Sequence, residues 1–527
     1  MTTDNSIADL VAAKSAEHAD AARPILTFVH VDANSALADV TRTYAQLQAN
    51  ADAIAGWLEA HGLRPGDCIA IMMNNHPEFV EAMIAAAILG LIWVPIDARA
   101  VGDKLAYMLN HAECRGVVAA DYCLDALTAV APQVASLGWL LAFGDTARAP
   151  AAGIEIANYK DALRCPAPAA VAIDPLSPMY LMYTSGTTGN PKAVVHTHGQ
   201  FMATAGSVAW LGARPGDVLY TGLSLTHINA QGTLRGGLAL GLPTVISRTF
   251  TKSRLWEICR AYGCTMFTLL GGMIPEVFAA PPRPDDADNP VRLVISAGMP
   301  ADLWNAYRER FGLEICEVYG ATEAGGSMLN PPGGRVGSMG KPDPSMEAAV
   351  FDEADRRLGS NEPGELRFRR RDGQPIVVRY YHNDQASADK VKDGWYRTGD
   401  VVRYDEDGWF YFLYRIGGGV RRNGDFVNTA LVESTISRSP MVDDVYVFGV
   451  ALPHNVAGEK TLVAMVVPVD PDAFDKTDLL AWCATVLERN DVPEIVHAVD
   501  AIPKTASEKP IEREAVAILK RDELVAA

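Results

Sequence analysis

The chain has 527 residues, of which 49% are hydrophobic and 21% are charged, and these proportions argue against wholesale disorder. Its formal net charge of −18 makes it a poor candidate for sequence-independent nucleic-acid binding, which needs a basic surface. A chain of this length predicts roughly two to four domains.

The N-terminal part of the chain alternates short apolar segments with amphipathic ones. The segments "DCIAIMMNN", "LIWVPID", "RGVVAAD", "TVISRTF", "TMFTLLGG" and "RLVISAG" predict strands, while "HPEFVEAMIAAAILG", "KSRLWEICRAYG" and "ADLWNAYRERFG" predict helices. This alternation is typical of an α/β fold with parallel-rich sheets flanked by helices. Ligands of such sheets usually lie at the carboxyl ends of the strands.

The character of the sequence changes from about residue 335. Residues 348–373 predict hairpins, because short apolar stretches are separated by turn residues, and we expect a β-rich subdomain at about 335–415. Its basic stretch "RFRRRDG" is either an anion site or, more simply, a solvated hairpin edge. Three glycines at 417–419 predict a flexible joint. We therefore predict a large N-terminal domain, 1–415, and a small mobile α+β domain, 416–527.

The cysteine spacing and the apolar segments indicate the cellular compartment in which the protein is expected. None of the eight cysteines forms a C-x-x-C pair, so free thiols in a reducing environment are the simplest expectation. The N-terminus lacks a basic segment followed by an apolar one, so no secretory signal is predicted. The most apolar segment, 82–96, is shorter than the roughly 20 residues that span a bilayer. We expect a cytoplasmic protein without a transmembrane segment.

The segment "YTSGTTGNPKAVVHTHG", residues 183–199, follows a predicted strand, "PMYLMY". Its glycines permit positive φ and close backbone approach to a ligand, and its hydroxyls and one lysine can together hold a polyphosphate. A connecting surface turn is the alternative, but such turns rarely combine four hydroxyls, two glycines and a lysine. The segment is not a Walker A loop, because Pro191 and Ala193 flank the lysine. The expected phosphate-binding residues are Thr184, Ser185, Gly186, Thr187, Thr188 and Lys192.

This segment resembles the phosphate-binding signature of the acyl-adenylate-forming enzymes, which include acyl-CoA synthetases, peptide-synthetase adenylation domains and firefly luciferase. Further matches follow in the family's order over most of the chain. In "RRNGDFVN" the chain is similar to carnitine/crotonobetaine-type and related bacterial acyl-CoA ligases. The resemblance implies an AMP-forming acyl-CoA synthetase whose substrates are ATP with Mg²⁺, a carboxylic acid and coenzyme A.

The segment "VYGATEAGG", residues 318–326, matches the second family signature. Tyr319 can stack on a purine, Thr322 can donate its hydroxyl to a phosphate, and Glu323 can bind Mg²⁺, a cation that takes few protein ligands alongside substrate phosphates. A solvated loop carboxylate is the alternative for Glu323. The resemblance implies the same roles and adds Gly320 to the ATP site. It also implies that the turn in "ISAGMP" borders the adenine through Ala297, Gly298 and Met299.

Other site residues are implied by the resemblance. Asp400, in "YRTGD", matches a carboxylate that binds both ribose hydroxyls, and such a group can accept two hydrogen bonds from a diol. Arg415 matches the ribose-binding arginine. The segment that approaches the pantetheine of CoA holds Arg421, Arg422 and Gly424. The residues expected at the acyl pocket are His227, Gly271, Gly272, Gly320, Gly325 and Gly326.

The segment "PKTASEKPIERE" resembles the C-terminal signature that carries the adenylation lysine, here Lys509. Its ammonium would stabilise charge that develops on phosphoryl oxygens during attack by the carboxylate. The chain departs from the family pattern in this half. Glu508 stands where glycine is usual, and Gly418 where a hinge Asp or Lys is usual. Arg421, Thr429 and Leu431 are further departures.

The sequence thus predicts that an acid is converted to an acyl-adenylate and then to a CoA thioester, with Lys509, His227, Thr322 and Glu323 as catalytic residues. An adenylating enzyme that passes its acyl group to a carrier protein or an amine is an alternative. A non-catalytic nucleotide-binding homologue is another. Gly325 and Gly326 leave room, which favours a bulky or cyclic acid without naming it. The sequence does not indicate the oligomeric state, and a homo-oligomer is one alternative.

Overall fold

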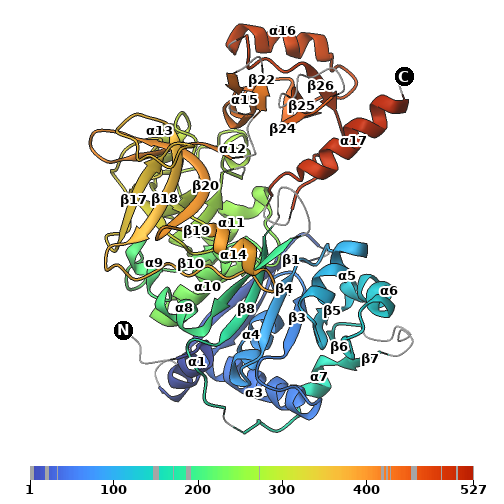
Figure 1. Cartoon of the computed structure of the whole chain (residues 1–527). Helices are drawn as coiled ribbons and strands as arrows, with labels where there is room; N and C mark the ends of the chain where they lie inside the picture. The colour runs from blue at the N-terminus through green and yellow to red at the C-terminus, as the bar shows by residue number, and fades with distance from the viewer. Residues whose placement is uncertain are drawn as a thin grey trace. The chain divides into compact units, whose positions relative to one another are not determined.

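The computed structural model describes residues 5–17, 23–32, 34–145, 154–169, 171–184, 191–271, 273–416, 420–422, 425–427, 429–452, 460–487, 489–505 and 508–525. The chain divides into two compact units (Figure 1). Unit 1 consists of Met1–Gly340 and Ile376–Lys392, and unit 2 of Lys341–Pro375 and Asp393–Ala527. Most of the β-rich residues expected in the large N-terminal domain are thus grouped with the C-terminal residues. The domain boundary at 415 stays a prediction.

The first sheet of unit 1 has the order β7-β6-β5-β3-β4-β8-β9. All neighbouring strands are parallel except the edge pair β8 and β9. Each position of β3, β4 and β5 is buried, as expected for a parallel sheet covered on both faces. The strands are β3 (Cys68–Met72), β4 (Ile92–Ile96), β5 (Gly116–Ala120), β6 (Trp139–Phe143), β7 (Glu155–Asn158), β8 (Pro178–Thr184) and β9 (Lys192–Thr197).

The second sheet of unit 1 runs β15-β14-β13-β12-β10-β11-β1-β2. Its central strands are parallel, and β2 and β15 pair antiparallel to their neighbours. The predicted α/β class with parallel-rich sheets is confirmed. The strands are β1 (Pro24–Val31), β2 (Leu37–Thr43), β10 (Leu219–Thr221), β11 (Thr244–Ser247), β12 (Met266–Leu270), β13 (Leu293–Ala297), β14 (Glu314–Gly320) and β15 (Ser327–Asn330).

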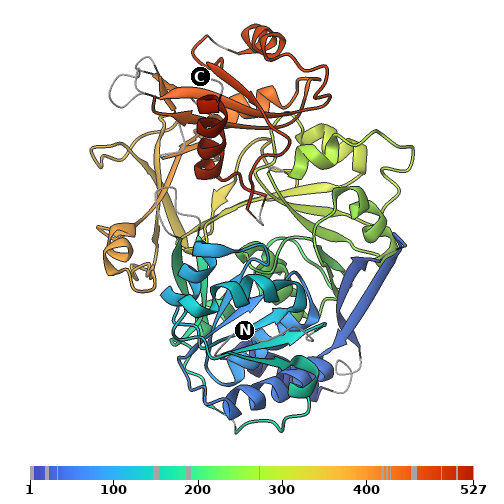
Figure 2. The same cartoon turned by 90° about the vertical axis from the view of Figure 1, so that its right-hand side faces the viewer.

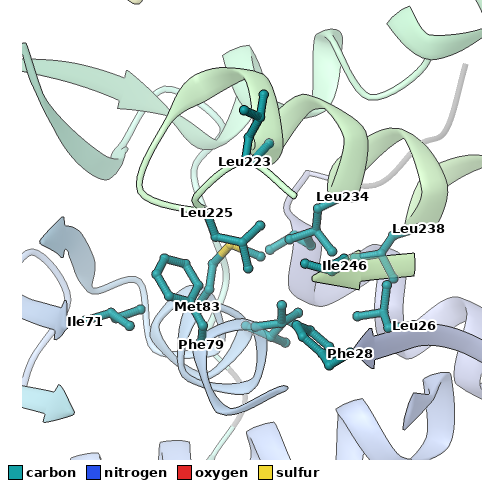
Figure 3. Close-up of a cluster of buried hydrophobic side chains, with 14 of the residues drawn as sticks. Leu26, Phe28, Ile71, Phe79, Met83, Leu223, Leu225, Leu234, Leu238 and Ile246 are labelled. Atoms are coloured by element: carbon teal, nitrogen blue, oxygen red, sulfur yellow. The ribbon is translucent and has the colours of Figure 1, made fainter. Parts of the chain in front are cut away.

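Two helices, α4 and α10, belong to a core that contains residues of both sheets. In Figure 3, Phe79 and Met83 of α4 lie among side chains from β1, β11 and α10. Helix α4 is apolar on almost every side, which explains why it is enclosed. The helices of unit 1 are α1 (Ile7–Ala16), α3 (Tyr44–Ala60), α4 (Pro77–Ile88), α5 (Gly102–His111), α6 (Leu124–Val130), α7 (Tyr159–Ala162), α8 (His198–Ala203), α9 (Ser207–Trp210), α10 (Ile228–Leu240), α11 (Leu255–Tyr262), α12 (Met273–Phe278), α13 (Trp304–Phe311) and α14 (Asp384–Lys390).

Side chains of α5 and α6 form a separate core on the other face of the first sheet. This core packs against alternate residues of β3, β4 and β5, so both faces of that sheet are covered. All eight cysteines are free thiols, as predicted, and seven of them are buried. In the described parts of the chain, no helix has both the length and the apolar character needed to cross a membrane.

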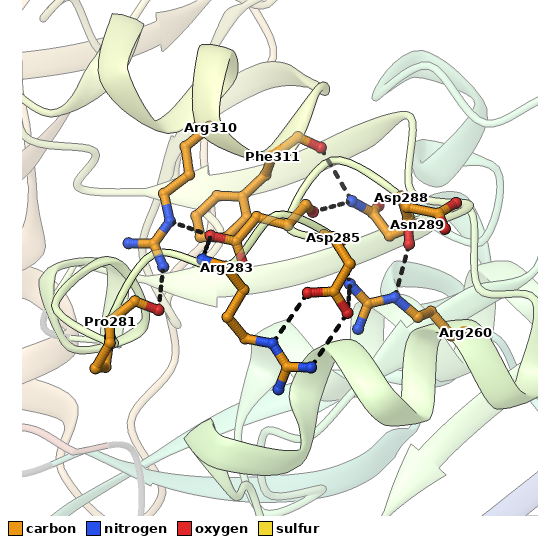
Figure 4. A network of polar contacts seen from close by, with 9 residues as sticks. Arg260, Pro281, Arg283, Asp285, Asp288, Asn289, Arg310 and Phe311 are labelled. Carbon is orange, nitrogen blue, oxygen red and sulfur yellow. Dashed lines mark hydrogen bonds and ion pairs between the residues drawn. The ribbon is translucent and has the colours of Figure 1, made fainter.

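Arginines fix the loop that leads from α12 into β13 (Figure 4). Arg310 donates a hydrogen bond to Asp286 over 2.7 Å, and Arg260 donates to the carbonyl oxygen of Asp288 over 2.7 Å. Arg283 pairs with Asp285 over 3.0 Å. Because α11 carries Arg260 and α13 carries Arg310, the network ties two helices to the loop that precedes β13.

Unit 2 contains an antiparallel sheet in which β17, β18, β20 and β21 are consecutive neighbours. This confirms the predicted hairpins at 348–373. Arg367, Arg369 and Arg370 of "RFRRRDG" form ion pairs with carboxylates of unit 2. Their strand, β18, lies between β17 and β20, and Arg367 is buried, so the predicted solvated hairpin edge is wrong for this residue. The strands are β17 (Met346–Phe351), β18 (Gly364–Arg370), β20 (Trp395–Tyr404) and β21 (Phe410–Arg415). The two-residue strand β16 (Lys341–Pro342) begins unit 2, and the two-residue strand β19 (Val391–Lys392) ends the second segment of unit 1.

The C-terminal residues of unit 2 form a three-stranded sheet, β24-β25-β26, covered on both faces. Side chains of α15 and α16 pack on one face, and Ala515 and Leu519 of α17 pack on the other. Figure 2 shows the ribbons of α16 and α17 on opposite sides of this sheet. The predicted small sheet with helices is confirmed. The elements are β22 (Val420–Arg422), β23 (Asp425–Val427), α15 (Thr429–Ile436), β24 (Val442–Val450), β25 (Thr461–Pro468), α16 (Lys476–Val486), β26 (Ile495–Ala498) and α17 (Glu512–Val525).

A fully buried carboxylate, Glu81 of α4, joins three other elements of unit 1. It accepts hydrogen bonds from Arg42 over 2.6 Å, from Asn50 over 2.8 Å and from Tyr159 over 2.8 Å. We predict that Glu81→Gln lowers the free energy of unfolding by about 2–4 kcal/mol, because the arginine loses its charged partner in a buried site. Urea denaturation measures the change. The control Glu59→Gln, at an exposed position of α3, should leave stability within about 0.5 kcal/mol of the wild type.

Candidate functional site

The predicted nucleotide-binding residues of unit 1 lie where strands end. Ala297 ends β13, Gly320 ends β14, and Gly271 follows the last residue of β12. These three strands are parallel neighbours, so their carboxyl ends meet at one edge of the second sheet. Thr184 ends β8 of the first sheet, and its hydroxyl donates to the carbonyl oxygen of Lys192 over 3.3 Å. Residues Ser185, Gly186, Thr187 and Thr188 lie outside the described parts of the chain.

The turn after β13 is held by a carboxylate that the sequence did not single out. Glu317 of β14 is 6% exposed and accepts hydrogen bonds from the backbone N–H groups of Gly298 and Met299, over 2.5 and 3.1 Å. Burial raises the pKa of this carboxyl, and the two hydrogen bonds oppose that rise. A charged residue in the middle of the apolar stretch "ICEVY", residues 315–319, was the signal available. Glu317, on the neighbouring strand, therefore fixes the backbone of the predicted adenine-binding turn.

Two glycines are required where the loops after β12 and β13 approach each other. Gly298 has φ +103°, a conformation that favours glycine. A Cβ atom on Gly271 would lie 3.1 Å from the carbonyl oxygen of Gly298, and one on Gly298 would lie 3.2 Å from Cα of Gly271. The two backbones can be this close only because Gly271 and Gly298 have no side chains. Gly272 lies outside the described residues.

The loop that follows β14 carries the predicted Thr322 and Glu323. It turns through a hydrogen bond from the N–H of Ala324 to the carbonyl oxygen of Ala321, over 2.9 Å. Oε1 of Glu323 accepts a hydrogen bond from the hydroxyl of Tyr380 over 2.6 Å. The second signature thus contacts Tyr380, a site residue that the sequence did not predict. Tyr319 and Thr322 are half-buried in the same region.

Lys192 of the first signature lies near the same tyrosine. Its Nζ is 5.6 Å from the centroid of the Tyr380 ring, within the range of a cation–π contact. Lys192 and Glu323 were predicted separately, from signatures more than a hundred residues apart in the sequence. In the structure both contact Tyr380, the lysine over the ring and the glutamate at the hydroxyl.

A neutral histidine lies next to this group. His196 of β9 stacks on Tyr180, with 4.5 Å between the ring centroids. Burial and the nearby Arg235 guanidinium lower the pKa of His196 to about 4, although Glu323 and the backbone of Thr322 favour its charged form. At pH 7 it contributes no positive charge to this group.

His227, predicted between ATP and the acyl pocket, is half-buried at the N-cap of α10. The loop before it is held by Asn75, which follows β3. The Asn75 amide donates to the carbonyl oxygen of Leu223 over 2.9 Å and accepts from the N–H of Leu225 over 2.8 Å. Sequence reasoning missed Asn75, because its partners lie about 150 residues away. Of the other predicted pocket residues, Gly325 is buried and Gly320 is exposed, and Gly326 is half-buried.

In unit 2, the predicted ribose-binding residues are direct partners across two antiparallel strands. Asp400 of β20 lies opposite Arg415 of β21, and Nη1 of the arginine is 3.5 Å from Oδ1 of the aspartate. Gly399, within β20, has φ +77°. The Asp400 N–H donates to the hydroxyl of Thr398 over 3.0 Å. A carboxylate held in this way can accept two hydrogen bonds from a vicinal diol.

Arg422, predicted to contact CoA, makes contacts within its own unit. Its Nη1 donates to the carbonyl oxygens of Asn490 and Val492, over 2.8 and 2.7 Å. Its Nη2 lies 3.6 Å from a carboxylate oxygen of Glu494. The guanidinium therefore braces the segment before β26, and a role toward CoA stays a prediction. Arg421 lies in β22, and Gly424 lies outside the described residues.

The predicted adenylation lysine lies in a closed loop of unit 2. An antiparallel bridge joins Lys504 to Pro510. The N–H of Thr505 donates to the carbonyl oxygen of Lys509 over 2.8 Å, and the N–H of Lys509 donates to the hydroxyl of Thr505 over 3.2 Å. The side chain of Lys509 is exposed. The loop thus fixes the backbone of the lysine and presents its side chain outward.

An ion pair anchors the start of this loop. Nζ of Lys504 lies 2.8 Å from Oδ2 of Asp444, on β24. Next to this pair, Glu433 of α15 accepts a hydrogen bond from the N–H of Val447 over 2.9 Å. Burial, with a smaller contribution from Asp444, raises the pKa of the Glu433 carboxyl to about 7.

The described residues contain no group of three or more His, Cys, Asp or Glu side chains that could hold a metal ion. The donor set at Glu323 is one carboxylate on a loop that follows a strand. Such a set suits Mg²⁺ that is bound mainly by substrate phosphates, and it does not suit an ion held by protein ligands alone.

Comparison with known protein families matches residues 16–381 to the AMP-binding enzyme family and residues 431–509 to the AMP-binding enzyme C-terminal domain. The first match covers well over half of the chain. The chain belongs to the AMP-binding enzyme family. This agrees with the superfamily that the signatures predicted.

Among curated proteins, the chain is similar to a crotonobetaine/carnitine–CoA ligase of Salmonella choleraesuis (strain SC-B67), with 27% identity over 483 residues, 89% of this chain and 92% of the relative. Among solved structures, an anthranilate CoA ligase in complex with anthranoyl-AMP has a TM-score of 0.81 at 22% identity, covering 98% of both chains. An o-succinylbenzoate coenzyme A synthetase from Bacillus subtilis, in complex with ATP and magnesium ion, has a TM-score of 0.76 at 23% identity, covering 96% of this chain and 98% of the other. These two solved structures have the same fold as this chain.

The residue before Lys509 has an unusual backbone conformation. Glu508 has φ +58°, in the left-handed region where a side chain costs about 1–2 kcal/mol. We predict that Glu508→Gly is more stable than Glu508→Ala by about 0.5–1 kcal/mol, because both remove the carboxylate but only glycine removes the strain. Thermal unfolding measures the difference. At the exposed helical position 517 of α17 the sign should reverse, so that Ala517→Gly is destabilising. Equal stability of the two Glu508 variants would contradict the left-handed conformation.

The raised pKa of Glu433 predicts a pH dependence of stability in unit 2. The carboxyl has a usual pKa of 4.5 and a pKa of about 7 in the fold, so the folded state holds the proton more tightly than the unfolded state. Its stabilising contribution is complete below pH 4.5 and is lost as the pH rises through about 7. Glu433→Gln is neutral throughout, so the wild type should lose stability relative to this variant as the pH rises. Thermal unfolding on both sides of pH 7 checks this, and exposed Glu514→Gln should follow the wild type.

Proposed function

We propose that this chain is an ATP-dependent carboxylic acid–CoA ligase that forms an acyl-adenylate and then an acyl-CoA thioester. The observation that carries the proposal is the meeting of Lys192 and Glu323 at Tyr380, beside the carboxyl ends of β8 and β14. Both residues belong to unit 1, and a loop carboxylate such as Glu323 is of the kind that binds Mg²⁺ alongside substrate phosphates. The curated CoA-ligase relative supports thioester formation with CoA.

In the first step, a carboxylate oxygen of the acid attacks the α-phosphorus of ATP. A bond from this oxygen to phosphorus forms, the bond to the departing pyrophosphate breaks, and an acyl-adenylate results. Lys192 and the loop that precedes it would hold the pyrophosphate oxygens, and Mg²⁺ bound at Glu323 would neutralise phosphate charge. Lys509 would stabilise the charge that develops on the α-phosphate during attack.

In the second step, the sulfur of CoA attacks the acyl carbon, and the bond from this carbon to the AMP oxygen breaks. The thiol proton is released, and the products are a thioester and AMP. Lys509 is proposed to serve only the first step, so the small domain would have to move between steps. The glycines at 417–419, which lie outside the described residues, would allow that motion.

We propose further nucleotide-binding residues in each unit, taken separately. Ala297, Gly298 and Met299 would border the adenine, and Tyr319 would stack on it. Asp400 and Arg415 would bind the ribose, since they form one pair at adjacent strands. The turn held by Glu317 has a backbone path fixed by two hydrogen bonds, which lowers the cost of ordering it around a ligand.

The acid itself would bind near His227 and the loop after β14, where Gly325 and Gly326 leave space in place of side chains. This favours a bulky or cyclic acid. A panel of carboxylic acids, from short chains to steroid-sized rings, can be screened by pyrophosphate release with ATP and Mg²⁺. Release that depends on both ATP and an acid supports adenylation, and no release with any acid contradicts it. Product analysis with and without CoA distinguishes CoA from a carrier protein or an amine as the acceptor.

Lys509→Ala is predicted to abolish most adenylate formation while it spares the second step. In single-turnover kinetics, acyl-AMP formation should fall by about 100-fold or more, because a cation placed at developing charge contributes at least this much to such reactions. Attack of CoA on supplied acyl-AMP should be nearly unchanged. Exposed Lys520→Ala on α17 is the matched control and should leave both steps unchanged. Survival of both steps in Lys509→Ala would show that Lys509 is misassigned.

A further inference from the structure

The segment that carries Tyr380 is joined to the strand that carries Lys192. The N–H of Val195 donates to the carbonyl oxygen of Arg379 over 2.8 Å, and the N–H of Tyr381 donates to the carbonyl oxygen of Ala193 over 2.8 Å. These bonds flank an antiparallel bridge between Val194 and Tyr380. The segment therefore extends the first sheet beyond β9, and its backbone position is set by the same strand that begins at Lys192.

The backbone of Tyr380 is also held from its C-terminal side. Its N–H donates to the hydroxyl of Ser387, on α14, over 2.8 Å. The side chain is 6% exposed, so the ring has little freedom. A buried ring on a fixed backbone can hold its hydroxyl at one point in space.

The carboxylate that this hydroxyl meets lies on a loop. Glu323 is half-buried, and the next residue, Ala324, has φ +52°. Tyr380 donates to Oε1 of Glu323 over 2.6 Å, the length of a charge-assisted O–H···O⁻ hydrogen bond. One carboxylate oxygen is thereby fixed by a donor from a distant segment, and the plane of the carboxylate is restricted.

We propose that Tyr380 is a positioning residue that holds Glu323 for Mg²⁺ bound to ATP, and that it links this carboxylate to Lys192. The inference rests on the proposed function. Partners that orient a metal ligand commonly change metal affinity by about 10–100-fold when they are removed. Nζ of Lys192 lies over the Tyr380 ring, whereas Glu323 accepts a hydrogen bond from the hydroxyl, so the two contacts can be separated by substitution.

Tyr380→Phe removes only the hydroxyl and keeps the ring that Lys192 contacts. Calorimetry of ATP binding, with Mg²⁺ and with EDTA, reads out the effect without turnover. We expect affinity for Mg·ATP to fall by about 10-fold, with affinity for ATP in EDTA unchanged. The neighbouring Tyr381, which contacts His111 and His382, provides the control. Tyr381→Phe should bind both forms as the wild type does. Thermal unfolding confirms that each variant is folded.

Glu323→Ala separates failure of this inference from failure of the proposed function. Weaker binding of Mg·ATP in this variant supports the role of Glu323, and unchanged binding would contradict the proposed site itself. If Glu323→Ala weakens binding and Tyr380→Phe does not, the inference is wrong and the proposed function stands. In the double variant, Tyr380→Phe should cause no further loss beyond that of Glu323→Ala. An additional loss of about 10-fold would show that Tyr380 acts independently of Glu323, and it would overturn the inference.

Discussion

The packing of α4 and α10 within one core determines the positions of the loops of unit 1 that carry the candidate site. Parallel sheets must be covered on both faces, and here residues of both large sheets contribute to a core that encloses these helices. The carboxyl ends of β12, β13 and β14 are thereby fixed at one sheet edge, and the loop before α10 is fixed by Asn75 from the other sheet. A fully buried carboxylate, Glu81, locks α4 to its neighbours by three hydrogen bonds.

Three polar side chains that lie outside the family signatures shape the candidate site. Glu317 holds the turn after β13, Asn75 holds the loop before His227, and Tyr380 holds Glu323. Glu317 does so from strand β14, Tyr380 from a segment bridged to β9, and Asn75 from the bend between β3 and α4. Loops that bind ligands carry few buried apolar contacts of their own, so such polar anchors give them a defined geometry.

The C-terminal residues use a different arrangement. Lys509 is exposed on a loop closed by Thr505 and anchored at Lys504 by the ion pair with Asp444. The backbone next to the lysine is left-handed although residue 508 is a glutamate. The usual glycine of the family at this position therefore has a conformational reason, since a left-handed residue without a Cβ atom is not strained. This chain retains the conformation without the glycine.

The sequence by itself determined the α/β class, the family and the identity of the signature residues, because these depend on local periodicity and on short motifs with characteristic composition. It also marked Glu508 as a departure, but it could not show why glycine is usual there, since φ is a property of the folded loop. Only the tertiary structure decided that Arg422 points toward Val492 and that Tyr380 meets Glu323 and Lys192. These contacts join segments 57 or more residues apart, and no local pattern encodes which side chains meet when strands pair over such separations.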